Sequence, residues 1–166
     1  MYRAVPRAFR PRRLAVSVLQ ALAVPSLLLT TASVAWAGCN SPAPTAGQTV
    51  TCDTNAPNPQ TTPVTASGAA GVTVNVGNGA QLQQSGGGSA LALVGAGGHL
   101  LSNQGAISSV GGVAGQLGGG SRVDNTGSIS TGNNIALQFV GAGDSVLVNR
   151  GTISGQTGVQ FDAGND

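Results

Sequence analysis

The sequence of 166 residues contains no lysine and no glutamate, and charged residues make up only 7% of it. Five of its seven arginines fall within residues 1–13, so Arg122 and Arg150 are the only later basic residues apart from one histidine. A protein that binds nucleic acid needs a patch of clustered basic residues, and this distribution cannot provide one beyond residue 13. We therefore expect no nucleic-acid partner.

The chain is equally poor in residues that perform catalysis. The "GAGDS" stretch (141–145) resembles the Gly-Asp-Ser nucleophile motif of one esterase family, but no histidine follows Ser145 to activate it. We interpret His99, the only histidine, as a surface turn residue equivalent to Asp144 two repeats later. Paired carboxylates of the kind that cleave polysaccharides are improbable with five aspartates and no glutamate. The sequence thus predicts no enzyme, no catalytic residue and no cofactor.

Metal binding finds little support in the sequence. "GAGDSVLVN" and "DAGND" partly resemble the Gly-Asp nonapeptides that bind calcium, in which carboxylates recur at a nonapeptide interval. Here Asp124, Asp144 and Asp162 are unequally spaced and do not share one repeat position. We therefore predict no metal site.

Residues 1–37 have the organisation of a secretory signal. A basic start is followed by an apolar run from Leu14 to Ala35, and "AWA" ends at Ala37, where we expect cleavage. The alternative is an uncleaved anchor helix, because the apolar run approaches the length of a bilayer span. Gln20, Pro25 and two threonines weaken such a span, and they favour a cleaved signal and an exported chain.

Two cysteines, Cys39 and Cys52, follow the expected cleavage point. In an exported chain such an even pair predicts one local disulfide, and a metal pair would lack partners because His99 is distant. The five prolines after residue 37 all lie within 38–63, which we interpret as an irregular lead-in held by this disulfide. A short strand is expected at residues 47–52.

From Val64 onward, short apolar runs of period two are separated by turns rich in Gly and Asn. The period predicts strands and the clusters predict turns. The phrase apolar-x-Asn-x-Gly-x-Ile occurs three times at nearly equal intervals, and a second apolar series recurs in phase with it. An interval of about 22–24 residues predicts a solenoid. The repeated positions are Leu101, Val123 and Leu147; Asn103, Asn125 and Asn149; Gly105, Gly127 and Gly151; Ile107, Ile129 and Ile153; and Leu93, Leu117, Phe139 and Phe161.

We predict an all-β fold, a parallel β-helix in which each coil corresponds to one repeat and contributes three short strands. Successive coils would stack about 4.8 Å apart, so that equivalent residues lie above one another. The isoleucines and the Leu/Phe series would then form inward stacks, with Phe139 and Phe161 both buried. The asparagines would form a ladder of side-chain amides at a bend. The glycine two residues after each asparagine is expected to have a positive φ.

The predicted organisation is therefore a signal (1–37), a lead-in (38–63) and four to five coils (64–166). The last repeat breaks off at "FDAGND", before its own Asn-Gly-Ile corner. An open coil presents unpaired strand edges. We accordingly expect the chain to be the first part of a longer protein, or its end to be covered by a partner.

The order of these features resembles the start of the large autotransporter passenger domains of Gram-negative bacteria. The resemblance rests on the signal, on "CNSPAPTAGQTVTCDTNAPNPQTTPV", on "VTVNVGNGA" (72–80) as a first coil, and on the Asn-x-Gly-x-Ile coils. It implies a right-handed β-helix displayed outside the cell after passage through the periplasm. Members of that family also carry a C-terminal barrel in the outer membrane, which we do not expect in this sequence, so outer-membrane contact would come only through such a barrel.

The function we expect is that of a secreted or cell-surface structural or adhesion module without catalysis. Its partners would be surface molecules of a host or of neighbouring cells. Two alternatives stay open: a fragment of a polysaccharide-acting β-helix enzyme, and a truncated reading frame without function.

Overall fold

The computed structural model describes residues 38–55 and 57–164, so the predicted signal lies outside the described residues. The described residues form strands and turns, and none of their segments is a helix long and apolar enough to cross a membrane. The strands are β1 (Thr49–Cys52), β2 (Val64–Ser67), β3 (Thr73–Val76), β4 (Gln81–Gln84), β5 (Leu91–Val94), β6 (Leu100–Asn103), β7 (Ala106–Ser109), β8 (Gly115–Gly118), β9 (Arg122–Asn125), β10 (Ser128–Thr131), β11 (Ile135–Val140), β12 (Val146–Asn149), β13 (Thr152–Ser154) and β14 (Thr157–Phe161).

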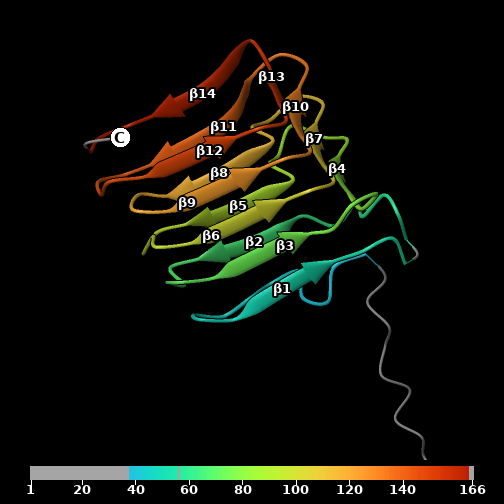
Figure 1. Ribbon diagram of the computed structural model, residues 1–166, viewed down its shortest axis with the longest axis horizontal. Helices are drawn as coiled ribbons and strands as arrows, with labels where there is room; N and C mark the ends of the chain where they lie inside the picture. Colours follow the sequence, from blue (N-terminus) through green and yellow to red (C-terminus); the bar gives the residue numbers. More distant parts are fainter. Residues whose placement is uncertain (1–37, 56, 165–166) are drawn as a thin grey trace, which may run out of the picture. The chain divides into compact units, whose positions relative to one another are not determined.

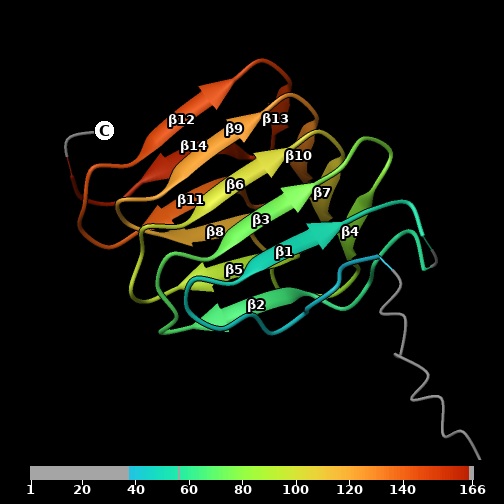
Figure 2. The ribbon, with the colours of Figure 1, turned by 60° about the horizontal axis from the view of Figure 1, so that its bottom comes forward.

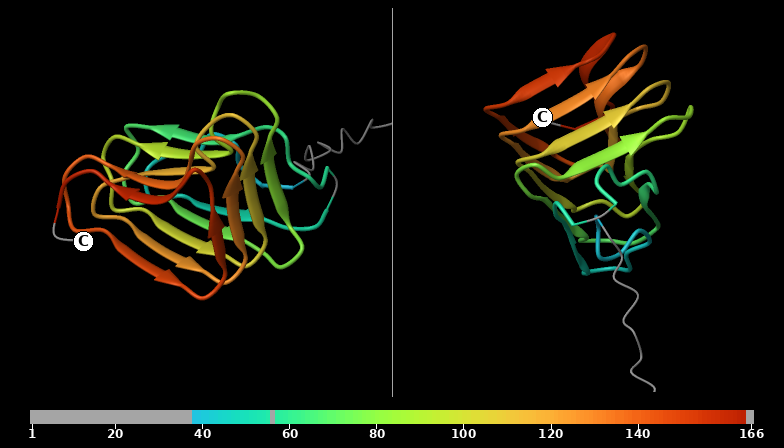
Figure 3. Two further views of the ribbon diagram at one scale, coloured as in Figure 1. Left: turned by 90° about the horizontal axis from the view of Figure 1, so that it is seen from above. Right: turned by 90° about the vertical axis from the view of Figure 1, so that its right-hand side faces the viewer.

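These strands form three parallel sheets, because each coil places one strand on top of its equivalent in the coil before (Figure 1). Sheet A has the order β1-β3-β6-β9-β12, which Figure 2 shows in sequence along one face. Sheet B has the order β4-β7-β10-β13, and sheet C the order β2-β5-β8-β11-β14. Figure 3 looks down on the last coil and shows the coils overlying one another. The predicted all-β parallel solenoid is confirmed, with about five turns.

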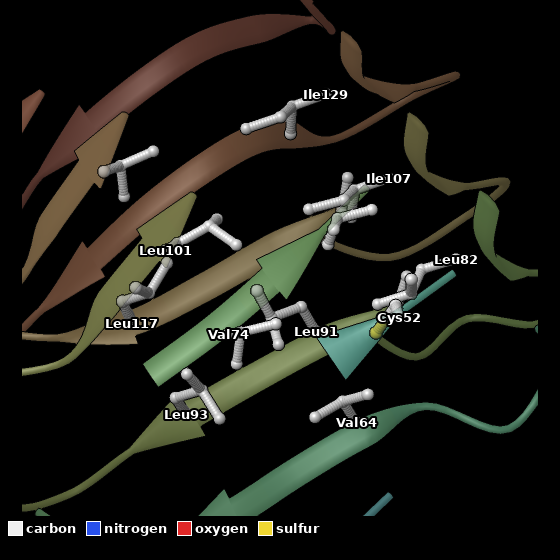
Figure 4. Packing of buried hydrophobic residues seen from close by; sticks show 14 of the residues in the cluster. Cys52, Val64, Val74, Leu82, Leu91, Leu93, Leu101, Ile107, Leu117 and Ile129 are labelled. Carbon is white, nitrogen blue, oxygen red and sulfur yellow. The ribbon is translucent and has the colours of Figure 1, made fainter. Parts of the chain in front are cut away.

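The registers place equivalent residues in columns along the solenoid. In sheet B, Leu82 pairs with Ile107, Ile107 with Ile129, and Ile129 with Ile153. In sheet C the phenylalanines extend a leucine column, and the rings of Phe139 and Phe161 are stacked with centroids 4.7 Å apart. Period-two alternation in strands of mostly four residues turns every second side chain inward, so the columns form one continuous apolar core (Figure 4).

The first coil begins earlier than the boundary predicted at residue 64. Strand β1 lies within the lead-in and pairs in parallel with β3, and Gln60 makes an isolated bridge to Leu82 in β4. The segment before β1 runs along its free edge: the Asn40 N–H donates to the Thr51 carbonyl and the Asp53 N–H to the Gly38 carbonyl. The short strand expected at residues 47–52 is confirmed as β1, in which Thr49–Cys52 alternates exposed and buried residues like a later strand.

The predicted disulfide is confirmed, since Cys39 and Cys52 are bonded and both are buried in the core. It fixes the segment before β1 against the end of the first coil. Farther along this segment, the Pro42 carbonyl accepts a hydrogen bond from Thr65 N–H of β2. We call residues 38–48 the N-terminal cap, because they pair with the outer edges of both strands of the first coil.

The last coil, β12 to β14, has no such cover among the described residues. Its inward residues Leu147, Ile153 and Val159 are only partly buried, although their equivalents in the previous coil are fully buried. The prediction that Phe139 is buried is confirmed, whereas the same prediction for Phe161 is wrong, because Phe161 is 38% exposed. Phe161 stacks on Phe139 from one side only, and no described coil lies on its other side.

Candidate functional site

The three asparagines of the repeated phrase lie one above another at the ends of β6, β9 and β12. Asn103 donates from Nδ2 to Oδ1 of Asn125, and Asn125 donates in the same way to Asn149, each over 2.7 Å. The ladder also closes two of its own corners, since Gly105 N–H donates to Oδ1 of Asn103 and Gly151 N–H to Oδ1 of Asn149. Asn103 and Asn125 are fully buried. This asparagine ladder is largely internal, so its role is architectural.

The glycines of the repeated phrase are needed at the corners because they have no side chain. The prediction of a positive φ is wrong for Gly105, Gly127 and Gly151, which are not among the glycines with a positive φ. A Cβ on Gly127 would overlap the carbonyl oxygen of Gly105, and one on Gly151 would overlap that of Gly127. The backbones of successive corners therefore approach so closely that only a residue without a side chain fits.

His99 is buried, with 2% of its surface exposed, so its interpretation as a surface turn residue is wrong. The pairing of Leu100 with Arg122 and of Arg122 with Val146 puts His99 in a column with Ser121 and Ser145, not with Asp144. Pairing His99 with Asp144 by their neighbouring glycines therefore placed the two repeats one residue out of register at this turn.

The side chains of this column bind the backbone of neighbouring coils. Nδ1 of His99 accepts a hydrogen bond from Val72 N–H over 3.2 Å, and Oγ of Ser121 accepts one from His99 N–H over 3.0 Å. Because Nδ1 accepts, the neutral imidazole carries its proton on Nε2, which is buried without a partner among the described residues. Burial lowers the pKa of His99 below its ordinary value of 6.5.

His99 and Ser145 belong to one column but stand two coils apart, with Ser121 between them. Two steps of the paired-strand spacing put them about 10 Å apart, beyond hydrogen-bond reach. Asp124 forms a salt bridge with Arg122, with Oδ1 and Nη2 2.7 Å apart, on the outer side of sheet A. Within the described part of the chain, no three His, Cys, Asp or Glu side chains gather closely enough to hold a metal ion.

The outer side of sheet B carries amides and hydroxyls but no charge. Its strands alternate, so the residues that flank each inward-pointing leucine or isoleucine point outward. Registers align them into two columns along the solenoid. We call this surface the amide–hydroxyl face, and it comprises Gln81, Gln83, Ala106, Ser108, Ser128, Ser130, Thr152 and Ser154.

Beside this face, an open groove of about 290 Å³ crosses three coils at the corner between sheets A and B. We call it the corner groove. It exists because the second coil (β3 to β5) turns this corner with four residues, 77–80, whereas the third (β6 to β8) and fourth (β9 to β11) coils use two. Its polar side chains are those of Asn78, Gln81, Gln104 and Ser128, and its other lining residues are Gly79, Ala80, Gly105, Ala106 and Gly127.

The four-residue corner of the second coil is held in place by the side chain of Asn58. Asn58 donates from Nδ2 to the Gly79 carbonyl over 3.0 Å, and its Oδ1 accepts from Gln81 N–H over 2.8 Å. The floor groups are paired as well: Ala106 N–H donates to the Ala80 carbonyl and Ser128 N–H to the Gly105 carbonyl. The floor of the groove is therefore preformed, and the carboxamides of its lining are not engaged by other described residues.

Comparison of the chain with protein families, with curated proteins and with solved structures finds no match. The assignment of a function therefore rests on the residues and geometry described above. Sequence reasoning singled out the ladder residues because they repeat. It missed the corner groove, whose signal in the sequence is the longer "GNGA" corner that replaces the two-residue corner.

Proposed function

We propose that the chain is a secreted or cell-surface structural and adhesion module that acts by presenting an outer surface and has no catalytic role. The observation that carries this proposal is the amide–hydroxyl face with its adjoining groove. Its side chains are held at the spacing of the coils by registers that extend from Gln81 to Thr152. A preorganised polar surface binds with little loss of side-chain and backbone freedom, which favours adhesion.

We further propose that the module is the leading part of an autotransporter passenger exported by a Gram-negative bacterium. The order of a disulfide-held cap and Asn-x-Gly-x-Ile coils supports this, together with the basic and apolar start of the sequence. A solenoid gains stability from contacts between neighbouring repeats, so it can fold coil by coil as it emerges from a membrane.

Adhesion is tested with beads that carry the protein, applied to bacterial and epithelial cells and to immobilised surface polysaccharides. The matched control is Ile129→Asp, whose core is disrupted while its outer surface residues are unchanged. The proposal expects retention of the native beads, loss of retention with the control, and no new reducing ends in the polysaccharides. Appearance of reducing ends would instead support the polysaccharide-acting enzyme. Retention by neither cells nor polysaccharides would contradict adhesion.

A further inference from the structure

We infer that the corner groove is a binding site for a neutral, unbranched oligosaccharide lying along the solenoid axis. This inference rests on the proposed adhesion function and names the site and the ligand class that adhesion would use. The groove crosses the second, third and fourth coils, from Asn78 and Gln81 through Gln104 to Ser128. Two coil steps give it a length of about 10 Å, which suits a linear ligand more than a flat or globular one.

The chemistry of the lining selects the ligand class. Three carboxamides and one hydroxyl supply both donors and acceptors, and sugar hydroxyls also donate and accept. None of the three carboxamide groups has a hydrogen-bond partner among the described residues, so all are available to a ligand. An oligosaccharide can satisfy them without any proton transfer or conformational change of the corner.

Charge and apolar surface exclude the other ligand classes. None of the lining residues is charged, so the groove has neither the cations that anionic ligands need nor the carboxylates that cations need. Arg150 occupies the equivalent corner of the fifth coil and does not line the groove. The apolar lining is limited to the alanines at 80 and 106, too little to hold an apolar ligand.

A peptide strand is a poorer fit for the same position. A strand that adds to a sheet needs unpaired backbone N–H and C=O groups along an edge. Along the floor of the groove the backbone is already paired from coil to coil, as the bonds of Ala106 to Ala80 and of Ser128 to Gly105 show. The contacts available to a ligand come mainly from the side chains of the lining. They suit a sugar better than a peptide strand, because the polar groups of a sugar point in all directions.

The groove is open and has no aromatic side chain on which a sugar ring could stack. Binding at one site therefore depends on exposed hydrogen bonds, each of which contributes modestly, and its dissociation constant should be in the millimolar range. Adhesion would then depend on many copies of the protein acting together on one surface.

The test is a titration of the isotope-labelled protein followed by nuclear magnetic resonance, which resolves the side-chain NH₂ signals of Asn78, Gln81 and Gln104. The probes are neutral linear hexasaccharides of glucose, galactose, mannose and N-acetylglucosamine, with an anionic hexagalacturonate for comparison. At least one neutral probe should shift these signals and those of backbone amides at 104–106 and 127–128. The hexagalacturonate should shift them less strongly than the best neutral probe.

Gln81→Ala and Gln104→Ala test the contacts, with Gln83→Ala as the matched control. Gln83 is exposed on the same strand as Gln81, but it does not line the groove. Loss of one exposed hydrogen bond should weaken binding about five-fold in each groove variant and leave the control unchanged. Surface substitutions of this kind seldom disturb folding, and the same spectra verify it.

Three results would overturn the inference: no neutral probe shifts the groove signals, hexagalacturonate binds as well as the best neutral probe, or Gln83→Ala weakens binding as much as Gln104→Ala. If beads carrying the Gln81→Ala/Gln104→Ala protein still adhere fully to cells, the groove is not the adhesive site and the adhesion proposal stands. If the groove binds an oligosaccharide but no cell retains the native beads, the adhesion proposal fails and the site stands.

Discussion

The first and last coils of this solenoid are built from the same columns but are covered differently. At the first coil, Val50 and Val64 are fully buried because the N-terminal cap lies along the outer edges of their strands. At the last coil, the equivalent residues Leu147 and Val159 are only partly buried. Phe161 is covered on one face by the ring of Phe139, and no described residue stacks on its other face. One repeat thus has two environments, set by whether a neighbour lies beyond it.

The difference shows that a repeat of this type does not bury its own core. Each coil contributes one layer of apolar side chains, and the layer becomes interior only when another layer or a cap covers it. In this protein the cap is irregular and disulfide-bonded, so it ends the stack where a further coil would otherwise pair. Among the described residues, the free energy of unfolding should therefore be distributed unevenly, with the last described coil the least stable where no further layer covers it.

The largest effect should come from placing a charge in the isoleucine column. Ile129 is fully buried and Ile153, its neighbour in the same column, is only partly buried. Ile129→Asp should unfold the protein, because an unpaired carboxyl group in the core and the lost apolar packing together cost several kcal/mol, a large share of the roughly 5–15 kcal/mol by which a domain is stable. Ile153→Asp should cost only about 1 kcal/mol, the typical effect of a point substitution, since its carboxylate can reach water.

Circular dichroism with thermal unfolding distinguishes the two variants. Loss of the sheet signal with Ile129→Asp alone would support the proposed difference between inner and terminal layers. A sheet signal retained by Ile129→Asp would show that the column register is wrong.

The next largest effect should come from opening the cap. Replacing Cys39 and Cys52 with serine releases a loop with a sequence separation of 13, which should cost roughly 3 kcal/mol of unfolding free energy. Urea unfolding measures this change, and addition of reductant to the serine variant controls for effects of the reductant itself. An unfolding free energy that is the same in the serine variant and the native protein would mean that the cap does not stabilise the first coil.

A smaller effect is expected along the asparagine ladder. Asn125 accepts from Asn103 and donates to Asn149, and it is fully buried, whereas Asn149 is exposed at the open end. Asn125→Ala should cost about 2 kcal/mol, because it removes buried hydrogen bonds and leaves groups of its neighbours unsatisfied. Asn149→Ala should cost less than about 1 kcal/mol, since water can replace the lost partner. Equal losses in urea unfolding would contradict the difference between a covered and an uncovered corner.

The smallest effect concerns pH and His99, which lies in a covered coil. Its folded-state pKa is lowered by burial, so the unfolded chain binds more protons below pH 6.5 and stability falls as the pH drops below that value. The melting temperature should therefore be lower at pH 5.5 than at pH 7.5. His99→Ser places at 99 the residue type found at 121 in the same column. Because serine does not titrate in this range, the substitution should abolish most of the pH dependence. An equal pH dependence in both proteins would exclude His99 as its cause.

Much of the fold could be predicted because the repeated phrase marks the positions that pair between coils. Ile107, Ile129 and Ile153 recur at the interval of one coil, and a parallel stack converts that interval directly into contact. Strand β1 was predicted at 47–52, but its membership of the first coil was not, since the prolines around it dominate the local composition. The exposure of Phe161 could not be foreseen from periodicity, because the pattern of a coil does not say whether another coil follows it.

The site could be predicted less well. The repeats identify what is structural, and the corner groove arises where the repeat changes, at the four-residue corner of 77–80. The burial of His99 depends on a register shift of one residue at a glycine-rich turn, which spacing alone does not resolve. The close approach of the corner backbones at Gly127 is likewise a property of stacked coils and not of any single turn.

The central claim is that the capped first coil is more stable than the uncovered last coil, although both are built on the same repeat. Hydrogen exchange followed by mass spectrometry tests this difference most directly. We expect amides of β1 to be protected nearly as well as those of β6 and β9, while amides of β12, β13 and β14 exchange fastest. Reduction of the disulfide should accelerate exchange in β1 without changing β12. Exchange in β1 that is as fast as in β14 in the oxidised protein would show that the N-terminal cap does not protect the first coil.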